Sequence, residues 1–542
     1  MSEQGEALNR VAREAGLPVK GLRKKNSDRP PGGGAPALYP VGPDGKGEDP
    51  TGEKLREMLT ELAMSKPNQC AMRQGEMIFV WLCAHGRLVV DADMPSLDGV
   101  YWIDSREEGA PIRRLAAAGS KEYFGSIFGM VCIANDFEKV RAAAAQKAVA
   151  TAAVPRVTLS LWWECKGVGR EKVVYISCGS GNMVKISAGA VEIVLPGHDG
   201  ILIPEEASLP SWNLVPEESE MPPDALEVFK SSSLSGDHRN VLAAAIIAMP
   251  AMRANDNPPL CIEGPNGSGK STILRLAGRI FDPSLAEISV GVGLQKSLDR
   301  GCSNRRLMIF DNLDQPRDQK WIVQAIEAKS TGAASLENRH YRNGETIGLP
   351  SRAAFWMSSI DASFLLRSGG YAHRAILLKA FEKVGAPEDE KLDAELTANR
   401  SAILSFIART LSKAIDSWED RTVKFRFPAW ARMVLAVARV LSIEDRMAGV
   451  LDSIQMQAHR RSVEASTFGA ALLESLPESG NEFVGTAREL FSSLGGKEAL
   501  GGETTATALG SYLGKSRTVL GTFFRMSDKI RTGTTVWTIT RA

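Results

Sequence analysis

The chain has 542 residues, 44% of them hydrophobic and 24% charged, which is the composition of an ordinary soluble protein with about three or four domains. The 65 Lys and Arg residues balance 64 Asp and Glu, so the net charge of +1 argues neither for nor against nucleic acid. Seven cysteines without a CxxC pair argue against a zinc ribbon or a disulfide framework. No apolar run approaches the roughly 20 residues of a membrane span and no signal-peptide core is present, so we expect a cytoplasmic protein, in bacteria or a phage-infected host.

Residues 1–50 predict a disordered basic tail followed by a linker. The linker sequence is RPPGGGAPALYPVGPDGKGEDP, which is rich in Pro and Gly and cannot bury a core. The tail before it carries a basic cluster, which is compatible with nucleic-acid contact or with a solvated tail: Lys20, Arg23, Lys24, Lys25 and Arg29.

Residues 51–235 predict an α+β domain. Apolar residues at helical spacing from Leu55 to Leu62 favour a first helix, and an Ala-rich stretch from Asp136 to Ala153 favours a second. Several apolar runs favour strands: MIFVWLCA, GRLVV, GVYWID, RVTLSLWWEC, EKVVYIS, VEIVL and GILI. Asp91 and Asp93 end one of them, but no partner ligand stands at a convincing distance, so we expect a polar strand exit and not a metal site.

Residues 236–385 alternate helices with short apolar strands, which is typical of an α/β nucleotide-binding domain. A full Walker A motif runs from Gly264 to Ser271, after the short strand LCI and before the helix that begins at Ile273. Its glycines let backbone N–H groups wrap phosphates, and the helix N-terminus adds its dipole. The predicted ATP-binding residues are Gly264, Pro265, Asn266, Gly267, Ser268, Gly269, Lys270, Ser271 and Thr272.

Roles within this motif follow from its chemistry. Lys270 is expected to reach the β- and γ-phosphates, and the Ser271 hydroxyl to bind Mg²⁺. The run RRLMIFDNLD, about forty residues after Lys270, ends a buried strand with Asp311, the predicted second metal residue. Asn312 follows it, where many enzymes of this kind place a glutamate base, so either Asp314 takes over or hydrolysis is slow.

A third strand, RAAFWMSSI, ends in Ser358, which we expect beside the γ-phosphate, although many strands end in Ser. Arg367 and Arg374 precede the next apolar strand. Each is a candidate arginine finger for the site of a neighbouring subunit, or a partner in a surface salt bridge.

Residues 386–476 predict a helical region, and residues 477–542 predict a winged-helix domain. We expect helices at 483–494 and 503–525, then a hairpin turning at Gly533. Basic residues in this span supply DNA-binding candidates, namely Lys515, Arg517 and Arg525. A helix with a basic wing commonly docks on DNA, although winged helices are also often protein-protein modules.

These motifs together resemble the ATPase–helicase part of phage, plasmid and integrative-element replication proteins, which are AAA+ ATPases similar to superfamily 3 and poxvirus-type primase-helicases. The resemblance covers roughly residues 160–542 and is carried by GPNGSGKST, FDNLD, TGAASLENRHYRNGE, MSSI, YAHRAILL and FVGTARELFSSL. It implies a ring, usually a hexamer, with ATP sites between subunits and a DNA-gripping hairpin before the MSSI strand.

The residues favour the same hairpin independently. Asn343-Gly344 is a strong turn signal between ENRHY and TIGL. Arg339, His340 and Arg342 cluster at the tip, where cations suit phosphate contact, unless the charges are incidental to a surface hairpin.

The sequence therefore predicts a replicative DNA helicase or translocase that uses ATP and Mg²⁺. Its N-terminal domain would make origin, primase or polymerase contacts. A second interpretation is a DNA-binding initiator or regulator that ATP switches, with slow hydrolysis and no unwinding. A third is a small-molecule kinase or signalling ATPase, which the hairpin and ring features disfavour.

Overall fold

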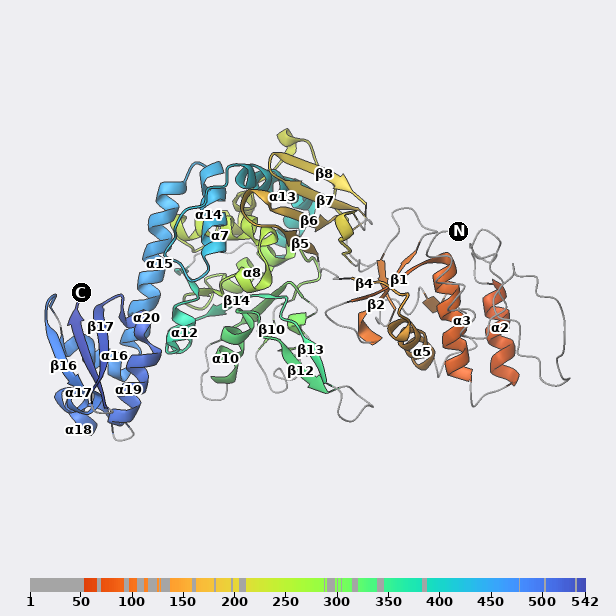
Figure 1. The fold of residues 1–542 in the computed structure, drawn as a ribbon. Coiled ribbons are helices and arrows are strands. Elements are labelled where there is room, and N and C mark those ends of the chain that lie inside the picture. Colours follow the sequence, from red (N-terminus) through yellow and green to blue (C-terminus); the bar gives the residue numbers. More distant parts are fainter. Residues whose placement is uncertain are drawn as a thin grey trace.

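The computed structural model describes residues 53–542, apart from gaps at 66–69, 92–96, 105–111, 116–123, 126, 128–136, 158–161, 180–181, 196–197, 204–210, 287, 290–297, 300, 304, 314–319, 339–345, 383–387, 477, 502–503 and 532–533. The predicted tail and linker lie outside these residues. Figure 1 shows an N-terminal unit in red and orange at one end, a C-terminal unit in blue at the other, and a parallel sheet between them. Within the described residues, no helix is long and apolar enough to cross a membrane.

The N-terminal unit packs helices on one face of a small mixed sheet. Its elements are α2 (Glu53–Ser65), α3 (Cys70–His85), β1 (Gly86–Asp91), β2 (Val100–Asp104), β3 (Ile112–Arg114), α5 (Phe137–Ala150) and β4 (Arg156–Val157). The strand order is β3-β2-β1-β4, in which only the β1–β4 pair is parallel. Aromatic side chains fill the core beneath the helices, with Trp81 and Trp102 fully buried.

The prediction of a strand at MIFVWLCA was wrong, because this run forms the second half of α3. A continuous apolar run has no period by which a buried strand and a buried helix can be told apart. Here the helix is buried on several sides, because the consecutive residues Met77, Ile78 and Phe79 are all buried. The predicted helices at 55–62 and 136–153 are confirmed as α2 and α5.

A second sheet of four antiparallel strands follows in meander order. It consists of β5 (Trp163–Lys166), β6 (Val173–Ser177), β7 (Met183–Ser187) and β8 (Ala190–Val194). Its inner side chains belong to one hydrophobic core with the chain after residue 236, whereas residues 55–154 have a core of their own. The cores therefore divide the predicted unit 51–235 between two parts of the molecule.

The segment Ile201–Ile203 joins those two parts. Leu202 packs with Val89 and Tyr101 on the outer face of the N-terminal sheet. Its neighbours Ile201 and Ile203 pack with Tyr175 and other residues of the second sheet. Alternate residues of an extended chain point to opposite sides, so three residues bury apolar surface in both directions.

The central sheet has five parallel strands in the order β10-β11-β14-β9-β15. These are β9 (Leu260–Glu263), β10 (Ile288–Ser289), β11 (Leu307–Asp311), β14 (Ala354–Ser359) and β15 (Ile376–Lys379). The helices around it are α6 (Glu227–Lys230), α7 (Gly236–Ala248), α8 (Lys270–Arg279), α10 (Lys320–Lys329), α11 (Ser363–Leu366) and α12 (Gly369–Ala372). All carboxyl ends lie at one edge of a parallel sheet, where α/β proteins bind ligands.

Two ion pairs, one buried and one partly buried, join the amino edge of this sheet to the parts of the chain before it. Arg352 lies just before β14 and donates to the Asp91 carboxylate at 3.2 Å, with Asp91 fully buried. Arg306 lies just before β11 and contacts Glu164 of β5 at 2.7 Å. Asp91 is thus an ion-pair partner at a strand exit, while Asp93 lies outside the described residues.

A hairpin of β12 (Ser335–Asn338) and β13 (Thr346–Leu349) precedes β14, and its antiparallel register, with Asn338 opposite Thr346, confirms the predicted pairing. Residues 339–345, including Arg339, His340 and Arg342, lie outside the described residues.

The predicted helical region is confirmed as four helices, α13 (Asp389–Asp416), α14 (Pro428–Val440), α15 (Glu444–Glu464) and α16 (Thr467–Ser475). The helices α13 and α14 share the core of the parallel sheet. Figure 1 shows α15 running from this core towards the C-terminal unit.

The C-terminal unit packs short helices against a three-stranded sheet in the order β16-β18-β17. Its elements are β16 (Glu482–Thr486), α17 (Ala487–Ser493), α18 (Gly496–Leu500), α19 (Ala506–Lys515), α20 (Arg517–Leu520), β17 (Phe524–Arg531) and β18 (Thr534–Arg541). The predicted helix at 483–494 begins too early, because Phe483 pairs with Ile539 and a capping box of Thr486 and Glu489 starts the helix at Ala487. The predicted helix at 503–525 is likewise two helices and the start of β17.

Candidate functional site

The loop of residues 264–269 curls over the end of β9 and leads directly into α8. Lys270, which is 5% exposed, donates from Nζ to the carbonyl oxygens of Gly264 and Pro265, both at 2.8 Å. From outside the loop, the Ser233 hydroxyl donates to the Ser268 carbonyl at 2.6 Å. The ammonium group is therefore held at the start of a glycine-rich turn, beside the N-terminus of a helix, where anions bind favourably.

The glycines of this loop are needed for two different reasons. Gly267 and Gly269 have φ of 74° and 79°, a left-handed conformation that costs a residue with a Cβ about 1–2 kcal/mol, although a Cβ there would meet nothing within 4 Å. At Gly264 the reason is space, because a Cβ would lie 2.4 Å from the Ala380 carbonyl oxygen next to β15. The loop thus packs closely against the residue after β15 at Gly264, whereas the space beside Gly267 and Gly269 is open for a ligand.

Asp311 and Ser358 meet beside this loop. The strands β11 and β14 run parallel with Phe310 opposite Met357, so the following residues lie side by side at the carboxyl edge. Asp311 Oδ1 accepts hydrogen bonds from the Ser271 hydroxyl and, at 2.6 Å, from the Ser358 hydroxyl. The first residues of α8 and the ends of two strands therefore converge on one carboxylate.

Asn312 supports this carboxylate. Its backbone has a positive φ of 52°, which is uncommon outside glycine and costs energy. In that conformation its N–H donates to Ser358 Oγ at 3.0 Å, and its side-chain amide donates to Asp311 Oδ2 at 3.2 Å. Asn312 thus holds Asp311 in place and offers no basic atom. Asp314, the predicted substitute base, lies outside the described residues.

The oxygens of Ser271 and Asp311 fit a magnesium ion. A hydroxyl and a carboxylate are the hard ligands Mg²⁺ prefers, and this ion usually takes one or two protein groups together with substrate phosphates. Among the described residues, no group of three or more His, Cys, Asp or Glu is arranged to hold a metal by itself. The arrangement therefore suits an ion that arrives with a phosphorylated ligand.

Arg374 lies at the opposite edge of the sheet. Because β15 pairs with β9 in parallel, with Ile376 opposite Leu260, Arg374 stands beyond the amino ends of both strands. Four strand residues, or about 13 Å, separate that edge from the glycine loop. Its guanidinium donates to the Gly370 carbonyl at 2.7 Å, and burial lowers its pKa. Arg367 follows α11 and is exposed.

The basic candidates of the C-terminal unit differ from one another. Lys515 ends α19 and Arg525 lies on β17, both exposed to solvent. Arg517 instead forms an ion pair with Asp528 of β17 at 2.6 Å and donates to the Met526 carbonyl. Two of these three positions therefore present their charge to the surroundings, while the third ties a helix to a strand.

One contact at the site had no signal in the sequence. Arg461, in α15, donates to the carboxylate of Glu263, the residue before Gly264. It also contacts Asp361, just after β14, at 3.0 Å. Arg461 is 198 positions from Glu263, so this contact is visible only in the folded structure. Through it, α15 is bonded to the carboxyl ends of β9 and β14, next to the glycine loop.

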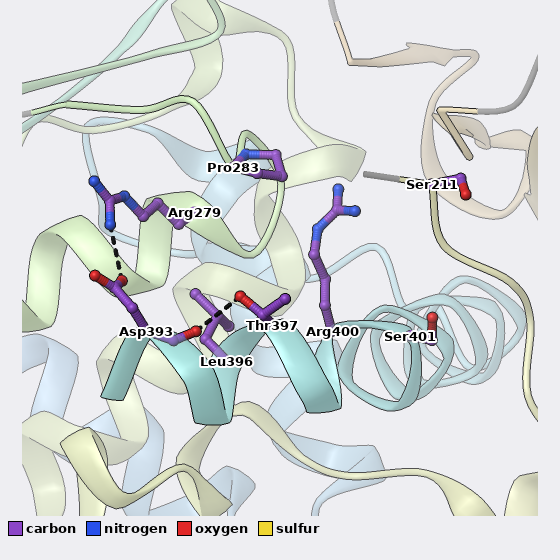
Figure 2. A pocket seen from close by; sticks show the side chains of 8 residues that line it. All are labelled: Ser211, Arg279, Pro283, Asp393, Leu396, Thr397, Arg400 and Ser401. Atoms are coloured by element: carbon purple, nitrogen blue, oxygen red, sulfur yellow. Dashed lines mark hydrogen bonds and ion pairs between the residues drawn. The ribbon is translucent and has the colours of Figure 1, made fainter. Parts of the chain in front are cut away.

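A pocket of about 220 Å³ lies between α8 and α13, and Figure 2 shows the side chains that line it. Arg279 forms an ion pair with Asp393 at 2.8 Å, and Arg400 donates to the Ile280 carbonyl at 2.9 Å. Arg279 is the last residue of α8, whereas Lys270 is the first, so about 13 Å of helix separates this pocket from the glycine loop. The pocket is not part of the site around Asp311.

Comparisons with known proteins found no matching family model and no matching curated protein. Among solved structures, one titled "SCCmec type IV Cch - active helicase" shares 13% identity, with 84% of this chain and 94% of that chain covered and a TM-score of 0.41. The apo C-terminal region of NrS-1 shares 12% identity, with 67% and 94% covered and a TM-score of 0.28. These scores are too low to carry a conclusion about activity.

Proposed function

We propose that this chain is an ATP-dependent DNA helicase or translocase. It would act in the replication of a phage or mobile element, as a ring with ATP sites between its subunits, a hexamer as the family resemblance implies. The observation that carries the proposal is the convergence of Lys270, Ser271 and Asp311 at the carboxyl edge of the parallel sheet.

The loop residues would bind the triphosphate. Backbone N–H groups between Gly264 and Thr272 line the turn and the start of α8, where the helix dipole favours negative charge. The Lys270 ammonium would exchange its two carbonyl partners for phosphate oxygens. Ser271 and Asp311 would hold Mg²⁺, which neutralises charge on the β- and γ-phosphates when bound.

The position of Arg374 supports a ring. An arginine finger stabilises the charge of the transition state at the γ-phosphate. Because Arg374 stands at the edge of the sheet away from its own loop, it would act on the site of an adjacent subunit. A closed ring of identical head-to-tail contacts supplies one such arginine to every site.

DNA would be held in two places. The hairpin of β12 and β13 would present Arg339, His340 and Arg342 to the strand in the central channel. The helices and antiparallel hairpin of the C-terminal unit support a winged helix, in which the exposed Lys515 and Arg525 would contact phosphates.

The direct test is unwinding of a forked duplex DNA with MgATP. We expect wild-type protein to separate the strands and Lys270→Ala to lose both unwinding and ATP turnover. The matched control is Lys391→Ala, which removes an exposed lysine that pairs only at the surface with Glu388. Intact DNA-stimulated ATP turnover without unwinding would restrict the proposal to a translocase.

The second candidate function is an ATP-switched initiator or regulator with slow hydrolysis. Asn312 favours it, because this residue holds Asp311 but cannot accept a proton from water. ATP turnover measured with and without single-stranded DNA separates the two functions. A motor is expected to accelerate on DNA, whereas a switch is expected to stay slow in both conditions.

A further inference from the structure

Three side chains from three parts of the chain form a continuous contact beside Arg374. His373 Nδ1 lies 3.3 Å from His459 Nε2, and His459 Nδ1 lies 2.8 Å from the Thr522 hydroxyl. The two imidazole rings are 5.4 Å apart between centroids. His459, at the centre, is only 6% exposed.

The contact connects the turn that carries Arg374 with the C-terminal unit. His373 is the residue before Arg374, His459 lies in α15, and Thr522 lies between α20 and β17. The helix α15 is built into both neighbours, because Ala458 packs in the core beneath α11 and α12, while Val463 packs in the core of the C-terminal unit. Figure 1 shows α12 and α20 at the same end of α15.

Both rings are neutral near pH 7. Burial, and then the charge of His373, lowers the pKa of His459 to about 4. Burial, followed by the nearby Arg426 and Arg374, lowers the pKa of His373. Because the Thr522 hydroxyl forms a hydrogen bond with Nδ1 of His459, the ring presents Nε2 to His373. A neutral imidazole has one N–H and one acceptor nitrogen, so it can form a hydrogen bond on each side.

We propose that Thr522 and His459 are positioning residues that hold the Arg374 turn in its working geometry, so that the C-terminal unit sets the rate of ATP hydrolysis. This inference rests on the proposed function of Arg374 as an arginine finger. Arg374 itself hydrogen-bonds only within its own turn, to Gly370, among the bonds described for its guanidinium, so its direction follows the direction of that turn. The state of the C-terminal unit thereby reaches the ATP site through side-chain hydrogen bonds.

The test compares Thr522→Val with Thr522→Ser. Valine keeps the shape of threonine and removes the hydroxyl, whereas serine keeps the hydroxyl. Loss of one hydrogen bond is expected to lower kcat for ATP about five-fold in Thr522→Val, with KM unchanged, because an arginine finger acts on charge that forms only in the transition state. Thr522→Ser is expected to retain the wild-type kcat. Thr518→Val is the matched control, since Thr518 is an exposed threonine one turn earlier.

Equal kcat values for Thr522→Val, Thr522→Ser and wild type would overturn the inference while leaving the proposed function intact. Absence of ATP turnover in the wild type would instead overturn the proposed function, and the inference with it. If Thr522→Val fails to fold, His373→Leu decides by the same readout, because leucine has no polar atom and removes the hydrogen bond to His459 from the other end. A wild-type kcat in that variant would overturn the inference.

Discussion

The two edges of the parallel sheet are chemically opposite. At the carboxyl edge, the strands β9, β11 and β14 end in or beside Glu263, Asp311 and Ser358, whose side-chain oxygens lie at the same edge as the glycine loop. At the amino edge, β11, β14 and β15 are each preceded by an arginine, namely Arg306, Arg352 and Arg374. Two of these arginines form ion pairs with Glu164 and Asp91 in preceding parts of the chain.

The two edges therefore serve different purposes: the carboxyl edge carries the candidate ligand site, and the amino edge carries ion pairs that hold the parts of the chain together. The carboxyl edge arranges oxygens around a loop that can take a charged ligand, which the sheet topology favours. At the amino edge, Arg306 and Arg352 instead fix the sheet to preceding parts of the chain, and Arg374 is the arginine that we propose acts on another subunit. Loss of Asp311 at the carboxyl edge should therefore impair turnover without unfolding, and loss of an ion pair at the amino edge should do the reverse.

The largest expected effect is at the carboxyl edge. Asp311→Asn keeps the shape of the side chain and an oxygen that can accept from Ser271 and Ser358, but removes the charge that holds the metal. We expect ATP turnover at saturating Mg²⁺ to fall by about 10²–10³-fold, with the urea unfolding midpoint unchanged. Asp452→Asn, at an exposed position of α15, is the control. Turnover near the wild-type level would remove Asp311 from the site.

At the amino edge, Arg352→Met removes the cation beside the fully buried Asp91 carboxylate. The expected cost is about 3 kcal/mol in the free energy of unfolding, read from urea denaturation of the N-terminal unit by its buried tryptophans. The affinity for MgATP is expected to stay at the wild-type value.

The double variant Asp91→Asn/Arg352→Met should recover part of that loss, because it also removes the buried charge. If the double variant is no more stable than Arg352→Met, the ion pair does not account for the stability of this edge.

The smallest effect concerns pH. In the folded chain the pKa of His459 is about 4, against 6.5 for an unperturbed histidine. Between these two pH values His459 is therefore mostly protonated in the unfolded chain and mostly neutral in the folded chain. Stability from this group is therefore full above pH 6.5 and is lost as the pH falls towards 4. At pH 5.5 the loss is about 1.4 kcal/mol. Comparing unfolding free energies at pH 7.5 and 5.5 for wild type and His459→Gln checks this, since the variant should lack that part of the dependence.

The carboxyl edge was largely predictable because its signals are local. The glycine loop, Lys270 and Ser271 are contiguous, and Asp311 and Ser358 each end an apolar run that can only be a strand in this context. The order of the strands was not needed to find them. The contacts that the structure adds, such as the bond of the Asn312 backbone to Ser358, depend on a left-handed conformation that no sequence pattern specifies.

The amino edge and the N-terminal unit were not predictable in the same way. Asp91 and Arg352 are 261 positions apart, so their pairing exists only in the fold. The run from Met77 to Ala84 was assigned to the wrong element, since its continuous apolar sequence has no period that distinguishes a helix from a strand. The contact of His373 with His459 likewise joins residues 86 positions apart.

The three residues Ile201–Ile203 pack between the N-terminal sheet and the second sheet. Since Leu202 faces the N-terminal sheet and its neighbours face the second sheet, lifting the N-terminal unit away would expose Leu202 and the outer face of the N-terminal sheet. Rotation of that unit against the rest of the chain is therefore opposed by the hydrophobic effect. The N-terminal unit is consequently expected to move together with the parallel sheet as one body.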